Sequence, residues 1–217
     1  LPTAIGFEQA ASMMTRGLTA QLLLRRAYAV QPGDVVLVHA AAGGVGQITC
    51  QWARALGATV IGTVGSAAKA EVARAHGCDL ALVQGRDDVV AQVRAATGGA
   101  GVAAVYDSIG RDTLTQSLDC LAPRGLMVAF GASSGPLPAL DTMELLKRGS
   151  LFFTRLTLAH YTAERPELEA AVADLFAVVA SGAVRVGASQ TFALSDAARA
   201  HAAMEARQTT GSTVLRV

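Results

Sequence analysis

Apolar and polar positions follow two alternating rhythms along this chain. Short, nearly continuous apolar runs are typical of strands covered on both faces, and the longer stretches between them have the apolar spacing of amphipathic helices. The predicted strands are Asp34–Ala40, Ala58–Val64, Leu80–Val83, Val102–Asp107, Leu126–Gly131 and Ser150–Leu156. The predicted helices between them are Val45–Leu56, Ala67–His76, Asp87–Thr97, Asp112–Leu121 and Thr142–Arg148. This alternation predicts an α/β fold with a doubly wound parallel sheet of about six strands.

Two segments lie outside this repeating unit. A long helical pattern, Phe7–Tyr28, precedes the first strand. After residue 157 the predicted elements are a helix at Pro166–Ser181, a strand at Thr191–Leu194, a helix at Asp196–Ala206 capped by Ser195, and a closing strand at Thr213–Val217. We therefore expect residues 1–15 to form a junction segment, 16–156 the sheet domain, and 157–217 part of a second, α+β unit.

Composition narrows the possible functions. The chain is 52% hydrophobic and 16% charged, so it can bury a substantial core. Its net charge of +1 gives no electrostatic case for nucleic acid or an anionic membrane surface, and no apolar stretch is long enough to span a bilayer. The three cysteines form no CxxC motif, which argues against a zinc site or a disulfide framework and for a cytoplasmic location. The first residue is Leu1 rather than Met, and we expect a processed or truncated product.

A glycine-rich segment, His39-Ala-Ala-Ala-Gly-Gly-Val-Gly46, directly follows the first predicted strand and opens a predicted helix. Such a turn brings backbone N–H groups close to a pyrophosphate. In the GxGxxG fingerprint Ala41 replaces the first glycine, while Gly43 and Gly46 are kept. The bare pattern also fits a tight turn without a ligand. The flanking strand and helix, and the second strand at Ala58–Val64, favour a dinucleotide site.

The end of the second predicted strand indicates which dinucleotide. Enzymes that prefer NAD usually place an acidic residue there for the ribose 2′-OH. This strand ends Gly62-Thr-Val-Gly65-Ser66, and Lys69 follows. Ser66 can donate a hydrogen bond and Lys69 supplies a positive charge, although a lysine here also fits a solvated helix position. The pattern therefore favours NADP(H) over NAD(H).

Several longer motifs resemble one family. They are His39-Ala-Ala-Ala-Gly-Gly-Val-Gly46, Gln51-Trp-Ala, Gly62-Thr-Val-Gly65, Val105-Tyr-Asp-Ser-Ile-Gly110 and Gly125-Leu-Met-Val-Ala-Phe-Gly131. They are similar to those of the zinc-independent NADPH:quinone oxidoreductases, the zeta-crystallin-like branch of the medium-chain dehydrogenase/reductase superfamily. The resemblance covers essentially the whole chain. It implies a Rossmann NADP(H)-binding domain followed by the C-terminal remnant of a GroES-like catalytic domain, whose N-terminal region would precede Leu1.

The resemblance also implies a set of cofactor-binding residues. Under the pyrophosphate it places Gly43, Gly44 and Val45. At the adenosine ribose and its 2′-phosphate it places Gly62, Ser66, Lys69 and Arg207. Along the cofactor and near the nicotinamide ribose it places Ser108, Phe130, Gly131, Ala132 and Ser133. Gln84 stands where close relatives have a tyrosine, so NADPH binding is expected either to be weaker or to be compensated by Arg86. The resemblance assigns no catalytic residue and no metal ligand to this chain.

The expected activity is NADPH-dependent reduction of quinones or related enones by hydride transfer, with this chain supplying the cofactor-binding part. The isolated chain is expected to have little or no turnover. Two alternatives remain: a zinc-free enoyl-thioester reductase, and a nucleotide-binding fragment without activity. A homodimer is expected through the apolar edge strand at 150–156, unless the tail covers that edge. The four histidines and the segments Ser12–Arg16 and Leu22–Arg26 are expected to be structural.

Overall fold

A six-stranded parallel sheet forms the centre of the computed structural model, which describes residues 1–3 and 5–217. The strands are β1 (Val35–Val38), β2 (Thr59–Val64), β3 (Leu80–Val83), β4 (Val102–Asp107), β5 (Leu121–Ala129) and β6 (Phe152–Arg155). Their spatial order is β3-β2-β1-β4-β5-β6, with every neighbouring pair parallel. The order reverses between β1 and β4, and ligands bind at such a switch point in open α/β sheets. The predicted α/β fold is confirmed.

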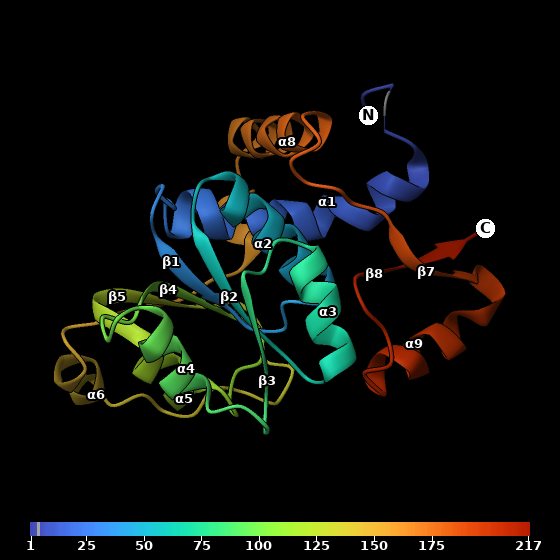
Figure 1. Cartoon of the computed structure of the whole chain (residues 1–217). Coiled ribbons are helices and arrows are strands. Elements are labelled where there is room, and N and C mark those ends of the chain that lie inside the picture. Colours follow the sequence, from blue (N-terminus) through green and yellow to red (C-terminus); the bar gives the residue numbers. More distant parts are fainter. Residues whose placement is uncertain (4) are drawn as a thin grey trace.

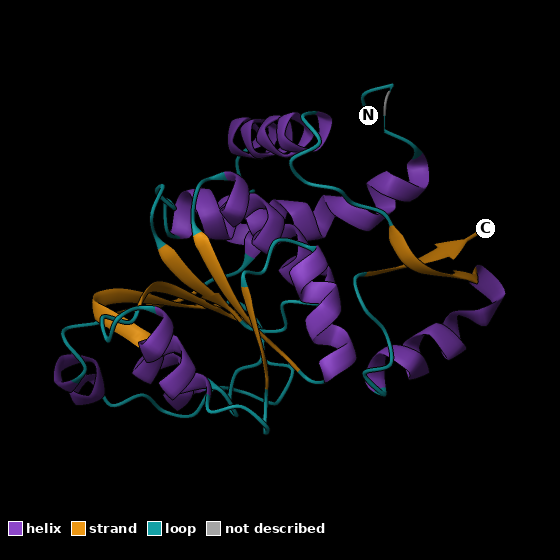
Figure 2. Cartoon of the chain, viewed as in Figure 1, coloured by secondary structure: helices purple, strands orange, loops and turns teal. Residues whose placement is uncertain are grey.

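Helices bury both faces of the sheet (Figure 1 and Figure 2). Alternate residues of a strand point to opposite faces, so Val36 and Val38 belong to one apolar core and Leu37 to the other. The first core contains side chains of α1 (Phe7–Gln21), α2 (Gly44–Ala55), α3 (Ala67–Ala75) and α8 (Arg165–Ala180). The second contains side chains of α4 (Val89–Ala96) and α5 (Leu114–Cys120), with α6 (Thr142–Lys147) at its margin. Coverage on both faces explains why the strands are continuous apolar runs.

The tail has two parts. Its helix α8 packs on α1, where the Leu175 side chain occupies the space that a Cβ on Gly17 would need. Beyond α8, β7 (Ala188–Ala193) and β8 (Ser212–Arg216) form a separate two-stranded parallel sheet joined by α9 (Ala197–Glu205), at the right of Figure 1. The domain boundaries expected at residues 15 and 156 stay predictions.

Several element boundaries differ from those predicted. β5 begins at Leu121 rather than Leu126, because Leu121 already pairs with Val102 before a shift in register. Residues 123–125 lie within this irregular part of β5, where Arg124 has φ +63°. The long N-terminal helix changes at its end into a π-helical segment, Leu22–Ala27.

The predicted cap of the last helix is wrong. Leu194–Asp196 tightens into a 3₁₀ turn, so α9 begins after Asp196 rather than after Ser195, and no side chain makes a capping hydrogen bond there. The sequence pattern also does not predict the short helix α7 (Leu158–Tyr161). Within residues 1–3 and 5–217, none of the helices combines the length and the apolar character needed to cross a membrane.

Candidate functional site

The glycine-rich turn joins the carboxyl end of β1 to the start of α2. Ala40 adopts φ +52°, and the Gly43 N–H donates to the Ala40 carbonyl at 2.8 Å, which closes the turn. A Cβ on Gly46 would overlap the Ala40 carbonyl oxygen, so α2 can lie this close to the turn only with glycine at that position. Ala41 is fully buried and its N–H donates to the Thr63 carbonyl at 3.0 Å. The residue that departs from the glycine fingerprint therefore anchors the turn to β2.

The first turn of α2 leaves backbone donors open. Its N-cap residue is Gly43, which has no side chain to accept a hydrogen bond, and the first turn contains no acidic residue. In the part of the chain that the structure describes, the N–H groups of Val45 and Gly46 have no acceptor. Unsatisfied N–H groups and the positive end of the helix dipole together favour an anion. These open donors are compatible with the pyrophosphate role implied for Gly43, Gly44 and Val45, which stays a prediction.

The carboxyl end of β2 gathers three of the predicted residues. Ser66 caps α3 by accepting a hydrogen bond from the Lys69 N–H at 3.3 Å. The Lys69 Nζ donates to the backbone carbonyl of Arg207 at 2.7 Å, although the two residues are 138 positions apart. No carboxylate of the described residues forms an ion pair with Lys69 or Arg207. The Ser66 hydroxyl, the Lys69 ammonium and the backbone of Arg207 therefore lie together at this end of the sheet.

The segment that carries Arg207 is tied to the glycine-rich turn. Gly211 forms an isolated parallel bridge with Gly43, and its N–H donates to the Ala42 carbonyl at 3.0 Å. The next residue, Ser212, donates from its hydroxyl to the Ser12 carbonyl at 2.9 Å. These bonds explain how a residue so late in the chain reaches the end of β2.

The loops after β4 and β5 lie side by side at the same edge of the sheet. The residues predicted here are Ser108, Phe130, Gly131, Ala132 and Ser133. A Cβ on Gly131 would overlap the Ser108 backbone, so glycine allows the two loops to touch. The Ser133 N–H then donates to the Ser108 carbonyl at 3.2 Å, and Arg155 donates to the Gly131 carbonyl at 2.6 Å. The structure thus brings these five residues together beside the switch point.

Gly62 and Gln84 have protein partners of their own. A Cβ on Gly62 would come within 2.6 Å of the Ala41 side chain and 2.7 Å of the Cys78 sulfur, so this position is closely packed inside the fold. Gln84 follows β3 and donates from its side chain to Gln116 of α5 at 2.7 Å. Arg86, the expected substitute for the missing tyrosine, is paired with Asp87 at 2.9 Å. The cofactor roles implied for Gly62 and Gln84 stay predictions.

A buried polar network lies directly beneath the site. His39, which follows β1, is hydrogen-bonded to Thr63 at 2.8 Å and to Ser117 at 2.9 Å. Ser117 donates to the Asp107 carboxylate at 2.9 Å, and Thr113 donates to the same carboxylate oxygen at 2.7 Å. Burial lowers the pKa of His39, and the nearby Asp107 carboxylate offsets part of this effect. A neutral imidazole thus links the ends of three neighbouring strands to α5.

This network also shapes the loop after β4. The second carboxylate oxygen of Asp107 accepts hydrogen bonds from the N–H groups of Ile109 at 2.7 Å and Gly110 at 3.1 Å. Ser108 is therefore held between an anchored strand end and an anchored turn. Sequence reasoning treated His39 only as a structural histidine. The signal that could have found the network is the position of His39 and Asp107 at the carboxyl ends of adjacent parallel strands.

All three cysteines are free and buried. Cys50 and Cys78 nevertheless come together: a Cβ on Gly77, which precedes Cys78, would lie 3.1 Å from the Cys50 carbonyl oxygen. The neighbouring Cys78 thiol, together with burial, raises the pKa of Cys50, while the Cys50 thiol lowers the pKa of Cys78. Burial raises the pKa of Cys120 to about 12.

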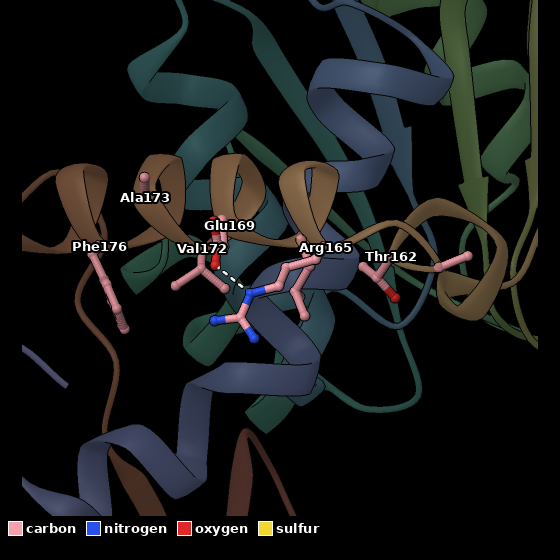
Figure 3. A pocket seen from close by; sticks show the side chains of 8 residues that line it. Thr162, Arg165, Glu169, Val172, Ala173 and Phe176 are labelled. Carbon is pink, nitrogen blue, oxygen red and sulfur yellow. Dashed lines mark hydrogen bonds and ion pairs between the residues drawn. The ribbon is translucent and has the colours of Figure 1, made fainter.

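A shallow hollow along α8 is remote from these groups. In Figure 3, Val172 and Phe176 extend from the helix on the same side as Arg165, which pairs with Glu169 at 2.7 Å. The lining is predominantly apolar and its one arginine is already paired with a carboxylate. It does not suit a charged dinucleotide, in contrast to the carboxyl edge of the sheet.

Comparison with known proteins decides the family. Residues 44–177, which include the first turn of α2 and the ends of β2, β4 and β5, match the family described as zinc-binding dehydrogenase. The chain belongs to this family. Among the residues that the structure describes, no group of three or more His, Cys, Asp and Glu side chains is placed to hold a metal ion. The zinc independence expected from the sequence stays a prediction.

The similar proteins place the chain within the family. A quinone oxidoreductase of Pseudomonas aeruginosa is 48% identical over 215 residues, which are 99% of this chain and 66% of the relative. A 2-haloacrylate reductase of a Burkholderia species is 50% identical over 206 residues, 94% of this chain and 62% of the relative. The crystal structure of Escherichia coli quinone oxidoreductase complexed with NADPH has a TM-score of 0.96 at 48% identity, covering 100% of this chain and 67% of the other. These findings confirm the predicted resemblance to the quinone oxidoreductases. The chain spans about two thirds of the length of these relatives.

Proposed function

We propose that this chain binds NADPH across the carboxyl ends of β2, β1, β4 and β5. The observation that carries the proposal is that Ser66, Lys69 and Arg207 lie together at the carboxyl end of β2. The neighbouring first turn of α2 has two open backbone N–H groups. A 2′-phosphate requires cations and hydroxyls without a competing carboxylate, and a pyrophosphate requires open N–H donors. Both requirements are met within the described residues. The NADPH complex of the E. coli relative supports the same cofactor.

The remaining predicted residues fit the other half of the cofactor. The adjoining loops that contain Ser108 and Gly131 lie on the far side of the switch point from Lys69. A dinucleotide that extends along the sheet edge from β2 to β5 would place its nicotinamide end at these loops. The buried bonds of Asp107 hold the β4 loop in place, so this end of the site is formed before the cofactor binds.

We further propose that the whole protein reduces quinones or related enones. NADPH, when bound, supplies a hydride to the acceptor. The residues of this chain bind and orient the cofactor, and the loops after β4 and β5 shield its nicotinamide end from water. The 2-haloacrylate reductase among the relatives supports an activated alkene as a second acceptor class. An enoyl-thioester reductase remains the alternative activity.

Calorimetric titration of the 217-residue chain with NADPH and with NADH tests the cofactor. We expect saturable NADPH binding that is clearly tighter than NADH binding, because only NADPH carries the 2′-phosphate. Equal affinities would contradict the proposed role of the β2 end, and no NADPH binding at all would overturn the proposed function.

Turnover is tested separately, with quinones, 2-haloacrylate and enoyl thioesters as acceptors. We expect little or no NADPH oxidation by the chain alone, since no catalytic residue is assigned to it. Rapid turnover of a quinone would contradict this expectation and identify the acceptor at the same time. The cytoplasmic location expected from the cysteine pattern stays a prediction.

We also propose that the protein forms a homodimer through β6. This strand is the last of the sheet, and among the described residues it pairs only with β5. Phe152 on this strand is 61% exposed, and Leu146 of the neighbouring α6 is 57% exposed. An open strand edge beside exposed apolar side chains favours pairing with a second copy. Analytical ultracentrifugation is expected to show a dimer that Phe152→Lys shifts toward monomer; a monomer at all concentrations would contradict the proposal.

A further inference from the structure

Arg16 of α1 lies directly on the first turn of α2. A Cβ built on Gly44 would overlap Nε and Cδ of the Arg16 side chain, so the arginine crosses the helix start at van der Waals distance from Gly44. The Arg16 side chain is only partly exposed. The sequence predicts only a structural role for the segment Ser12–Arg16.

The charge of Arg16 is not compensated by protein groups. Within residues 1–3 and 5–217, Arg16 forms no ion pair and its guanidinium makes no hydrogen bond, whereas neighbouring Arg25 and Arg26 both pair with carboxylates. The first turn of α2 contains no acidic residue. Burial of the guanidinium lowers the pKa of Arg16, which is the direction expected for a cation removed from water without a partner.

The position of Arg16 at the start of α2 is also electrostatically unfavourable without a ligand. The N-terminus of a helix carries a partial positive charge, and a cation placed there is repelled rather than attracted. A partly buried arginine thus lies on Gly44, in the same helix turn as the open N–H groups of Val45 and Gly46. An anion at this helix start would accept from the open N–H groups and balance the charge of Arg16, and a guanidinium can offer two parallel donors to a phosphate.

We propose that Arg16 is a pyrophosphate-binding residue of this site. The inference rests on the proposed NADPH function and extends it: the glycine-rich turn supplies backbone donors, and a helix from outside the sheet unit supplies the charge. Because NADPH and NADH share the pyrophosphate, Arg16 adds affinity for both. Lys69 and Arg207, by contrast, act only on the 2′-phosphate.

A packing role makes a different prediction. The aliphatic stem of an arginine can cover apolar surface while its charge stays in solvent. If that were the purpose of Arg16 on Gly44, a neutral side chain of similar length would preserve binding. The two roles therefore differ in whether the positive charge is needed. Replacement by glutamine removes the charge, and replacement by lysine keeps it on a different side chain.

The test measures calorimetric dissociation constants of Arg16→Gln and Arg16→Lys for three probes: NADPH, NADH and adenosine 2′-monophosphate, which has the 2′-phosphate but no pyrophosphate. For Arg16→Gln we expect roughly tenfold weaker binding of both NADPH and NADH, and unchanged binding of adenosine 2′-monophosphate. Arg16→Lys should keep part of the affinity. Arg54→Gln is the matched control, because Arg54 lies at the opposite end of α2 and is largely exposed. Thermal unfolding of each variant checks that it is folded.

The outcomes separate the inference from the function on which it rests. If the unaltered chain binds NADPH and Arg16→Gln binds it equally well, Arg16 has no pyrophosphate role and the proposed function stands. If Arg16→Gln weakens adenosine 2′-monophosphate as much as NADPH, the residue acts elsewhere and the inference is wrong. If the unaltered chain binds none of the three probes, the proposed function fails, and the inference with it.

Discussion

The side chain of Lys69 donates a hydrogen bond to the main-chain carbonyl of Arg207 at 2.7 Å. One residue lies in the first turn of α3 and the other just after α9, where Arg207 adopts φ +56°. The bond fixes the backbone of the tail against the end of β2. It also places Lys69 beside the backbone of a second basic residue, and neither residue forms an ion pair with a described carboxylate. This arrangement supports the proposed binding of the 2′-phosphate at the end of β2.

Replacing either cation should therefore change cofactor selectivity. We expect Lys69→Ala and Arg207→Ala each to weaken NADPH binding by about tenfold or more, because each removes a charge-assisted hydrogen bond to the 2′-phosphate. NADH affinity should change little. Calorimetry with both cofactors measures the difference. Lys147→Ala is the matched control, since Lys147 is an exposed lysine on α6 paired with Glu144; equal losses for NADPH and NADH in Lys69→Ala would contradict the assignment.

Much of this site follows from the sequence alone. β3 and β4 have the bounds predicted, because each is an apolar run bordered by turn residues. The carboxyl ends of parallel strands meet at one edge, so residues that follow different strands, such as Ser66 and Ser108, could be placed together without coordinates. Long-range contacts could not: nothing near Arg16 in the sequence indicates that α1 crosses the start of α2.

The end of β2 offers a second test of selectivity. Ser66 is where an NAD-dependent enzyme would have an acidic residue for the ribose hydroxyls. Ser66→Asp should keep the cap of α3, because aspartate is also a good N-cap residue. The new carboxylate should repel the 2′-phosphate and so reduce the affinity for NADPH. The preference for NADPH over NADH should therefore narrow or invert. Ser66→Ala is the companion variant: it removes the cap, which costs about 1 kcal/mol of stability, without adding a charge.

If the two Ser66 variants alter the NADPH to NADH ratio equally, the effect comes from the lost hydroxyl rather than from the new carboxylate. Fluorescence titration of both cofactors, with chemical unfolding of each variant, distinguishes the two causes. A ratio that does not change in Ser66→Asp would place the 2′-phosphate away from this residue.

The buried imidazole of His39 should make stability depend on pH. Burial lowers the pKa of His39 in the fold below its ordinary value of 6.5, so the unfolded chain binds a proton at a higher pH than the folded one. The stability that this lowered pKa contributes to the fold is therefore complete above pH 6.5. It is lost as the pH falls from 6.5 toward the lowered pKa of the folded state. Urea unfolding of the chain between pH 5 and 8 should show a free energy of unfolding that decreases as the pH is lowered below 6.5.

His39→Gln should remove that part of the pH dependence, and it should also lower stability at neutral pH. The hydroxyls of Thr63 and Ser117 lose a well-placed partner, and breaking a buried hydrogen-bond network costs on the order of 1–3 kcal/mol. His201→Gln is the control, because His201 is an exposed residue of α9. If His39→Gln keeps the full slope between pH 5 and 6.5, another group is responsible for it.

The network also shows where sequence reasoning ends. In the sequence, His39 is an isolated histidine next to a glycine-rich turn, and Ser117 is a small residue in a predicted amphipathic helix. Their hydrogen bond joins residues 78 positions apart and depends on how α5 packs across β1 and β4. Side-chain pairs of this kind are set by how whole helices and strands pack together. Hydrophobic periodicity predicts which face of an element is buried, but not which side chains touch.

Tyr106 gives the last prediction. This residue of β4 is fully buried in the core on the α2 face, and its hydroxyl has no hydrogen-bond partner in the described structure. Desolvation raises the pKa of the phenol well above its ordinary value, so it stays neutral. An unsatisfied buried hydroxyl costs about 1–3 kcal/mol, and phenylalanine retains the ring that fills the core. Tyr106→Phe should therefore leave stability unchanged or raise it by about 1 kcal/mol. Thermal and urea unfolding measure this, with Tyr106→Leu as the comparison that loses ring volume; destabilisation by Tyr106→Phe would show that the hydroxyl has a partner, such as an ordered water.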